Sequence, residues 1–136
     1  MLADLISEQD KQNFELAQSY SRKGDLPKTL ELMQELVDSN PELPVFRAVL
    51  ANTYWDMEDY DGAEAEFGHA IHLAPEYEVC SLGLFHCLWE QNKREEALIE
   101  KKKFRLLAPL KEYLPVPKAL AEELPQNDDM ASGNEA

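Results

Sequence analysis

The sequence is poor in glycine, in cysteine and in basic residues, and each shortage excludes a class of protein. Of 136 residues, 5 are glycine and 2 are cysteine. No glycine-rich phosphate loop and no nucleophile elbow is present, so we expect neither an enzyme nor a cofactor. No apolar run approaches the ~18 residues that a transmembrane helix needs. The first residues lack the basic and apolar regions of a secretory signal, so we expect a cytoplasmic protein.

The two cysteines, Cys80 and Cys87, are not expected to form a disulfide. They are seven positions apart. On one helix, a rise of ~1.5 Å per residue separates them by ~10 Å, beyond the ~7 Å limit for a disulfide. Two buried thiols in a reducing compartment fit this spacing better than a stapled secreted fold.

Acidic residues greatly outnumber basic ones. There are 27 Asp and Glu against 13 Lys and Arg, a formal net charge of −14. Such a chain is repelled by nucleic-acid phosphates and by anionic membranes, so we expect neither as a partner. The charge is also uneven, because residues 1–92 hold 18 acids and 5 bases, 93–111 hold 3 and 7, and 112–136 hold 6 and 1. The lysines of the basic segment form either a solvated face or a contact with an acidic patch.

What the sequence does contain is a repeat with a period of 34 residues. Pro41, Pro75 and Pro109 are spaced by this step. Because proline lacks an N–H, each one ends the second helix of a unit. The same step relates apolar, small and turn residues: Leu16, Leu50 and Leu84; Ala17, Ala51 and Phe85; Tyr20, Tyr54 and Leu88; Gly24, Glu58 and Asn92; Thr29, Ala63 and Ala97; Leu36, Ala70 and Phe104.

The middle unit carries the fullest motif, Leu50-Ala51-x-x-Tyr54, then Tyr60-x-x-Ala63, Phe67, Ala70 and Pro75. The three units, at 10–43, 44–77 and 78–111, resemble the tetratricopeptide repeat (TPR) family. Thr29 and Phe85 depart from the small residues usual at their positions. The resemblance covers about three-quarters of the chain. It implies an all-α, right-handed α-solenoid of three helix–turn–helix units, which stack because none buries its apolar face alone.

Both ends of the array are expected to be capped. The segment beginning at Ser7 has the form of a capping box, which places the start of the first helix near this residue. Residues 112–124 are expected to form a short capping helix, with Pro117 in its first turn. Residues 125–136 are polar and acidic and are expected to be a disordered tail. We therefore expect a single TPR domain over residues 1–124.

In this family the first helix of each unit lines a concave groove that binds partners. Trp55 and Trp89 take equivalent places in successive units, so they are either aromatic anchors for a partner or packing residues between units. Only Asn52 matches the residues with which some members clamp chaperone C-terminal carboxylates, so no such clamp is expected. The resemblance implies these partner-binding groove residues: Phe14, Gln18, Asn52, Trp55, Val79, Leu82, His86 and Trp89.

No metal site is expected. His69 and His72 share a helix face but lack a third ligand, so they do not indicate zinc. The acidic segment 56–62 superficially resembles a calcium loop. It has no glutamate six residues after Gly62, and the repeat explains it as an inter-helix turn.

Together these features predict a non-enzymatic protein-interaction module, a scaffold or chaperone-like adaptor that holds a protein or peptide partner in its groove. A basic partner is the sharper form of this prediction, because the acidic field would speed its association. Two alternatives stay open. The chain is an acidic immunity or antitoxin-type protein that neutralises a cationic toxin, or it is a structural subunit that self-associates into a homo-oligomer through the ends of the array.

Overall fold

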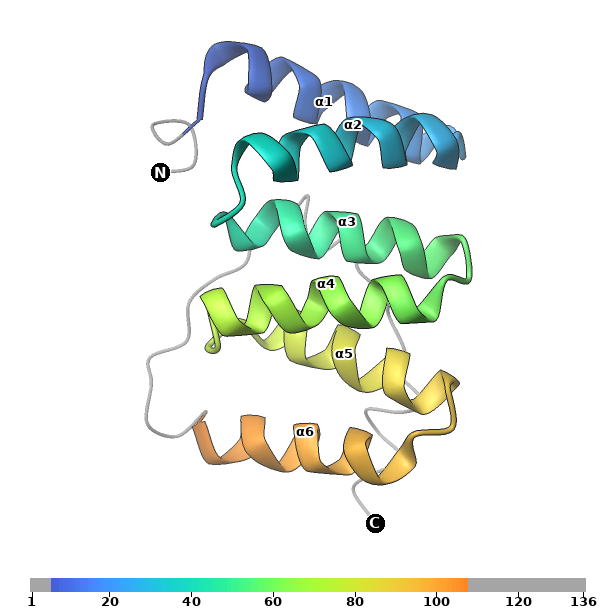
Figure 1. Ribbon diagram of the computed structural model, residues 1–136, viewed down its shortest axis with the longest axis vertical. Helices are drawn as coiled ribbons and strands as arrows, with labels where there is room; N and C mark the ends of the chain where they lie inside the picture. The colour runs from blue at the N-terminus through green and yellow to red at the C-terminus, as the bar shows by residue number, and fades with distance from the viewer. Residues whose placement is uncertain (1–5, 108–136) are drawn as a thin grey trace.

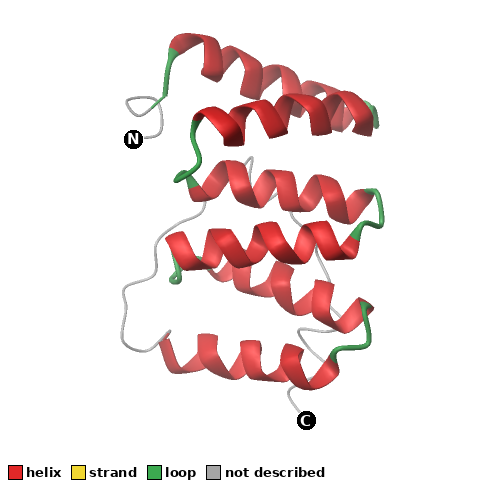
Figure 2. Cartoon of the chain, viewed as in Figure 1, coloured by secondary structure: helices red, strands yellow, loops and turns green. Residues whose placement is uncertain are grey.

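The structure, a computed structural model, describes residues 6–107 and arranges them as one stack of helices (Figure 1). Within this range there are six α-helices and no strands (Figure 2). Successive helices pack as pairs, which confirms an α-solenoid of three helix–turn–helix units. The expected cap and tail lie outside the described residues. The helices are α1 (Glu8–Arg22), α2 (Leu26–Ser39), α3 (Pro44–Asp56), α4 (Tyr60–Leu73), α5 (Glu78–Glu90) and α6 (Arg94–Leu107).

Side-chain caps start three of these helices. Ser7 Oγ accepts a hydrogen bond from the Asp10 N–H at 3.0 Å, which confirms the expected start of α1. Asp25 and Asp59, 34 positions apart, each accept from the backbone N–H three residues further on, at 3.3 and 3.0 Å. Each cap satisfies a donor that the first turn of a helix leaves without a partner. The start of the second helix therefore recurs with the repeat.

The turn inside each unit has a left-handed residue at one fixed position. Gly24, Glu58 and Asn92 have φ of 82°, 62° and 65°. This conformation costs a residue other than glycine ~1–2 kcal/mol, and only the first unit has glycine there. The expected turn positions are thus confirmed, and they reverse the chain so that the second helix of each unit packs against the first.

The interior is continuous through the first two units and thins in the third. Small residues such as Ala17, Ala51 and Ala63 are fully buried where paired helices approach. The main core cluster extends from α1 to α5. In contrast, Phe85, Leu88 and Ala97 of the third unit form a separate, smaller cluster. The stack is therefore less well supported at its C-terminal end.

A polar pair links the two helices of the second and third units at equivalent positions. Arg47 donates to Glu66 at 3.0 Å between α3 and α4. One repeat later, Ser81 donates to Glu100 at 2.8 Å between α5 and α6, where both residues are buried. A buried carboxylate needs such a partner, so the pair fixes how the helices of a unit face each other.

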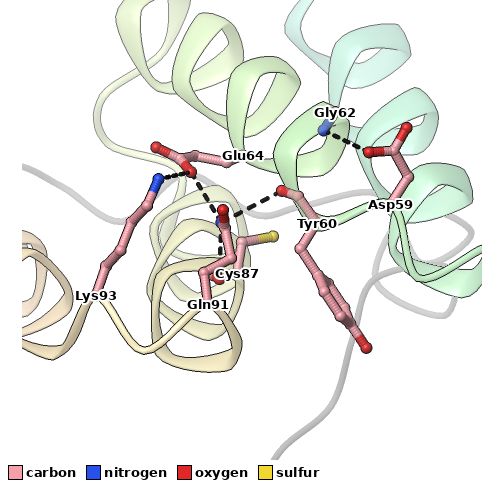
Figure 3. Close-up of polar contacts among 7 residues, drawn as sticks. All are labelled: Asp59, Tyr60, Gly62, Glu64, Cys87, Gln91 and Lys93. Atoms are coloured by element: carbon pink, nitrogen blue, oxygen red, sulfur yellow. Dashed lines mark hydrogen bonds and ion pairs between the residues drawn. The ribbon is translucent and has the colours of Figure 1, made fainter.

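A second polar cluster joins the middle unit to the third (Figure 3). Glu64 on α4 accepts from Gln91 Nε2 at 2.8 Å and from Lys93 Nζ at 3.0 Å. Gln91 Nε2 also lies 3.0 Å from the carbonyl oxygen of Cys87 (Figure 3). These bonds tie α4 to the turn between α5 and α6 and set the register of the two units.

Phe67 of α4 packs against Gly83 of α5 where the middle and third units meet. A Cβ built at Gly83 would lie within 2.7 Å of three atoms of the Phe67 ring, Cζ, Cε1 and Cε2, and Phe67 is fully buried. Real Cβ atoms essentially never come within 3.0 Å of another heavy atom. The absent side chain therefore lets the two helices pack at this distance.

We expect Gly83→Ala to destabilise the protein by ~1–3 kcal/mol, because it overfills this contact. Gly68→Ala is the matched control, since Gly68 is also helical but a Cβ there meets nothing within 4 Å. It should stabilise by up to ~1 kcal/mol through helix propensity. Urea unfolding measures both. Changes of the same sign would show that the contact with Phe67 does not constrain the stack.

Candidate functional site

The eight residues expected to bind a partner lie on the first helices of the three units, and we call them the first-helix face. Equivalent positions of stacked units point the same way. The face thus has three rows of equivalent positions. They are Phe14 with Leu82; Gln18 with Asn52 and His86; and Trp55 with Trp89, while Val79 on α5 completes it.

The structure divides this face into accessible and interior residues. Asn52 and His86 are only 5% and 2% exposed, so they belong to the interior and offer little surface to a partner. The physical reason is that α3 and α5 lie within the stack, with packed helices before and after each. The other members keep accessible surface: Leu82 is exposed at 37%, and Phe14, Gln18, Trp55, Val79 and Trp89 are partly exposed.

The structure also forms a row of aromatic rings from α4 to α5, which we call the aromatic row. The Tyr60 and Trp55 ring centroids are 5.1 Å apart, and Trp55 lies 6.3 Å from His86. The row continues from His86 to Phe85 at 5.7 Å and from Phe85 to Trp89 at 5.5 Å. Such spacings are the ones that favour aromatic pairs. The row therefore holds both tryptophans in place.

Each tryptophan is covered by the first residue of the helix that follows it. Tyr60, which begins α4, meets Trp55 edge-on. Arg94, which begins α6 and is equivalent to Tyr60, lies 4.3 Å from the ring centroid of Trp89. Each tryptophan thus has two such neighbours, with Tyr60 and His86 beside Trp55 and Phe85 and Arg94 beside Trp89, and both stay partly exposed. Tyr60 and Arg94 are not among the residues predicted from the sequence to bind a partner, although each follows a tryptophan by five residues.

The Tyr60 end of the aromatic row lies near two carboxylates, whereas the Arg94 guanidinium lies over Trp89 at the other end. Partial burial, and then the charges of Glu90 and Glu58, raise the pKa of Tyr60 above its usual value. Glu58 is the left-handed turn residue and Glu90 directly follows Trp89, and both are exposed. A cation that approaches this end of the face meets carboxylates beside aromatic rings.

His86 is the polar residue in the middle of the row. Its Nδ1 is the one buried side-chain nitrogen or oxygen without a hydrogen-bond partner among residues 6–107. Burial lowers the pKa of His86 below its usual value. The imidazole is therefore neutral at pH 7 and packs as an aromatic ring.

The cysteines and histidines of the described residues do not assemble into a metal site. Cys80 and Cys87 are free and buried, and burial raises the pKa of each thiol to about 12. Neither is a reactive nucleophile in this state. His69 and His72 are exposed, and residues 6–107 contain no group of three His, Cys, Asp or Glu that would hold a metal. In the same range no helix is both long and apolar enough to cross a membrane.

We expect the protein to lose stability as the pH falls below 6.5. The folded His86 resists protonation because its pKa is lowered, whereas in the unfolded chain it binds a proton near 6.5. The unfolded state thus binds more protons in this window, so the free energy of unfolding decreases as pH falls. His86→Leu should flatten the decrease between pH 7 and 5, measured by urea unfolding.

The matched control for this test is His72→Leu, because His72 is exposed. This variant should keep the pH dependence of the unchanged protein. A His86→Leu protein with the same dependence would contradict the role assigned to the buried imidazole.

Comparison with known proteins shows the fold alone. No protein-family model matches the chain. No curated protein matches it either. A solved mutant of MamA is similar with a TM-score of 0.67 at 21% identity, over 74% of this chain and 74% of that chain. The structure of MamA AMB-1 has a TM-score of 0.68 at 20% identity, over 76% of this chain and 62% of that chain. This chain therefore shares the helical-repeat solenoid of MamA.

Proposed function

We propose that this protein is a TPR-type interaction module that holds a protein or peptide partner on its first-helix face. The observation that carries the proposal is the accessible apolar surface on this face. Leu82 is 37% exposed, on a helix whose neighbouring residues Ser81 and Gly83 are buried. A single exposed leucine is ordinary. Together with partly exposed Trp55 and Trp89 it is a surface typical of partner binding.

The stack holds this surface rigidly, which favours binding. Trp55 and Trp89 are each supported by a ring or a guanidinium, so a partner meets side chains that are already ordered. Ordering a flexible side chain on binding costs ~0.5–1.5 kcal/mol. A preorganised aromatic pair avoids that cost, and two tryptophans suit the role of anchors.

The partner that this face suits best presents basic side chains among apolar ones. Residues 1–92 carry 18 acids against 5 bases. Glu58 and Glu90 lie near the aromatic row. Carboxylates beside aromatic rings stabilise a lysine or arginine through charge and through the ring face. A cationic toxin is one partner with this chemistry, and a basic segment of an assembly partner is another.

We expect Leu82→Glu to weaken peptide binding about tenfold or more, because a buried leucine contributes ~1.5–3 kcal/mol. The probe is a peptide selected from a random library against the full chain, and fluorescence anisotropy measures its affinity. Leu73→Glu on α4 is the matched control, since Leu73 is also 37% exposed but lies on a second helix. Equal losses in the two variants, or none, would rule out the first-helix face.

We also expect the association rate of the selected peptide to fall as ionic strength rises, because screening weakens attraction to the acidic body. Stopped-flow measurements over a salt series test this. A rate that is indifferent to salt would remove the basic-partner form of the proposal, while the Leu82→Glu result would still decide the location of the site.

A further inference from the structure

The middle and third units share an arrangement of three positions where the first helix of the unit ends. A tryptophan lies near the end of that helix, a left-handed turn residue follows it by three positions, and the first residue of the next helix follows it by five. Equivalent positions of stacked units point the same way, so the two units can be compared directly. The positions are filled by Trp55, Glu58 and Tyr60 in the middle unit and by Trp89, Asn92 and Arg94 in the third.

In the third unit the chain fills this arrangement with a cation of its own. The guanidinium carbon of Arg94 lies 4.3 Å from the ring centroid of Trp89. Arg94 Nε also donates a hydrogen bond to Asn92 Oδ1 at 3.2 Å. The ring and the turn residue thus hold one guanidinium between them, because a cation is attracted to the face of an aromatic ring and to a carbonyl oxygen.

The middle unit has the same positions, but it fills them with a carboxylate and a second ring. Glu58 takes the left-handed place of Asn92, and Tyr60 takes the place of Arg94. The rings of Trp55 and Tyr60 lie 5.1 Å apart, and both are partly exposed. A hydrogen bond from a cation to a carboxylate is roughly twice as strong as one between neutral groups. The turn of the middle unit is therefore the better acceptor for a guanidinium.

Glu90 brings a second carboxylate toward Tyr60 from the third unit. It ends α5 and is exposed. After partial burial, the charge of Glu90 is the largest cause of the raised pKa of Tyr60, ahead of the charge of Glu58. The Tyr60 ring points away from the polar cluster around Glu64 (Figure 3). Two carboxylates from different units thus lie near one partly exposed phenol.

The two cations of the turn between α5 and α6 are already engaged. Lys93 Nζ pairs with Glu64 at 3.0 Å, and Arg94 is held by the third unit as described above. Both are thereby directed to groups other than Glu58 and Glu90.

We propose that the end of α3 holds a subsite for one arginine side chain of the partner. We call it the arginine subsite, and it consists of Trp55, Glu58, Tyr60 and Glu90. The proposal rests on the function proposed above and deepens it, because it gives the basic side chain of the partner one place. A guanidinium suits this place better than an ammonium, since it is planar, stacks on rings and donates to two carboxylates at once. Trp89 takes no second cation, because Arg94 already covers it.

The test follows the two tryptophans separately while a small arginine probe is added. The probe is N-acetyl-argininamide, and nuclear magnetic resonance records the indole N–H signals of the nitrogen-labelled full chain. Trp55→Phe and Trp89→Phe assign these signals. The Trp55 signal should shift with a dissociation constant on the order of millimolar, as a ligand of this size allows. The Trp89 signal should stay in place. N-acetyl-citrullinamide, which has nearly the same shape but no charge, is the control probe and should move neither.

Glu58→Gln and Glu90→Gln should each weaken binding of the arginine probe roughly two- to fivefold, the size expected for one exposed ion pair. Glu35→Gln is the matched control, because it removes the same charge from an exposed position on α2. This variant should bind the probe as the unchanged protein does.

An exchange of residues between the units tests the comparison itself. Asn92→Glu with Arg94→Tyr gives the third unit the residues of the middle one, so the Trp89 signal should now respond to the arginine probe. Glu58→Asn with Tyr60→Arg gives the middle unit its own cation and should abolish the response of Trp55. Circular dichroism of every variant confirms that the helices are intact.

Three results would overturn the proposal. They are a Trp55 signal that the arginine probe does not move, a shift of equal size with the citrulline probe, and equal shifts of both tryptophan signals in the unchanged protein. Because this test uses no peptide, its failure is distinct from failure of the proposed function. The effect of Leu82→Glu on peptide binding decides whether the first-helix face binds a partner, whatever the arginine probe does.

Discussion

The stack depends on the contact in which Phe67 of the middle unit packs against the backbone of α5 at Gly83. No unit of this size buries its own apolar face, so the array exists only if units meet closely. The Phe67 ring is fully buried at this junction, and glycine leaves it room. Glu64 adds hydrogen bonds to Gln91 and Lys93 beside it. Since α5 packs on the middle unit through this junction, the junction also helps to position His86, which lies three residues after Gly83 and meets Trp55 of α3.

Around that junction, equivalent positions of the units make the same contacts with different residue types. The pair between Arg47 and Glu66 becomes Ser81 and Glu100 one unit later, with hydrogen bonds of 3.0 and 2.8 Å. Likewise, the residue that packs against Trp55 is Tyr60, and the one at the equivalent position against Trp89 is Arg94. Small core residues and the left-handed turn fix the backbone, so other positions are free to change. Partner chemistry can then differ along the array without any change of fold.

The sequence predicted the features that depend on local chemistry. The start of the first helix follows from the capping residue Ser7, and the structure has it there. The turns inside the units follow from the 34-residue period, and the structure has them at Gly24, Glu58 and Asn92. The burial of a side chain could not be predicted in this way, because it depends on how the preceding and following units pack against it. Periodicity made Asn52 and His86 equivalent to Gln18. It could not show that α3 and α5 bury these two residues while Gln18 keeps accessible surface.

Two surfaces of opposite character follow from the uneven charge, and they select different occupants. The first-helix face belongs to the acidic body, which favours a basic partner. The exposed side of α6 is apolar and basic, because Leu98, Ile99 and Leu106 are exposed there together with Lys102, Lys103 and Arg105. A basic partner is therefore attracted to the first-helix face, whereas the lysines and the arginine of α6 repel it.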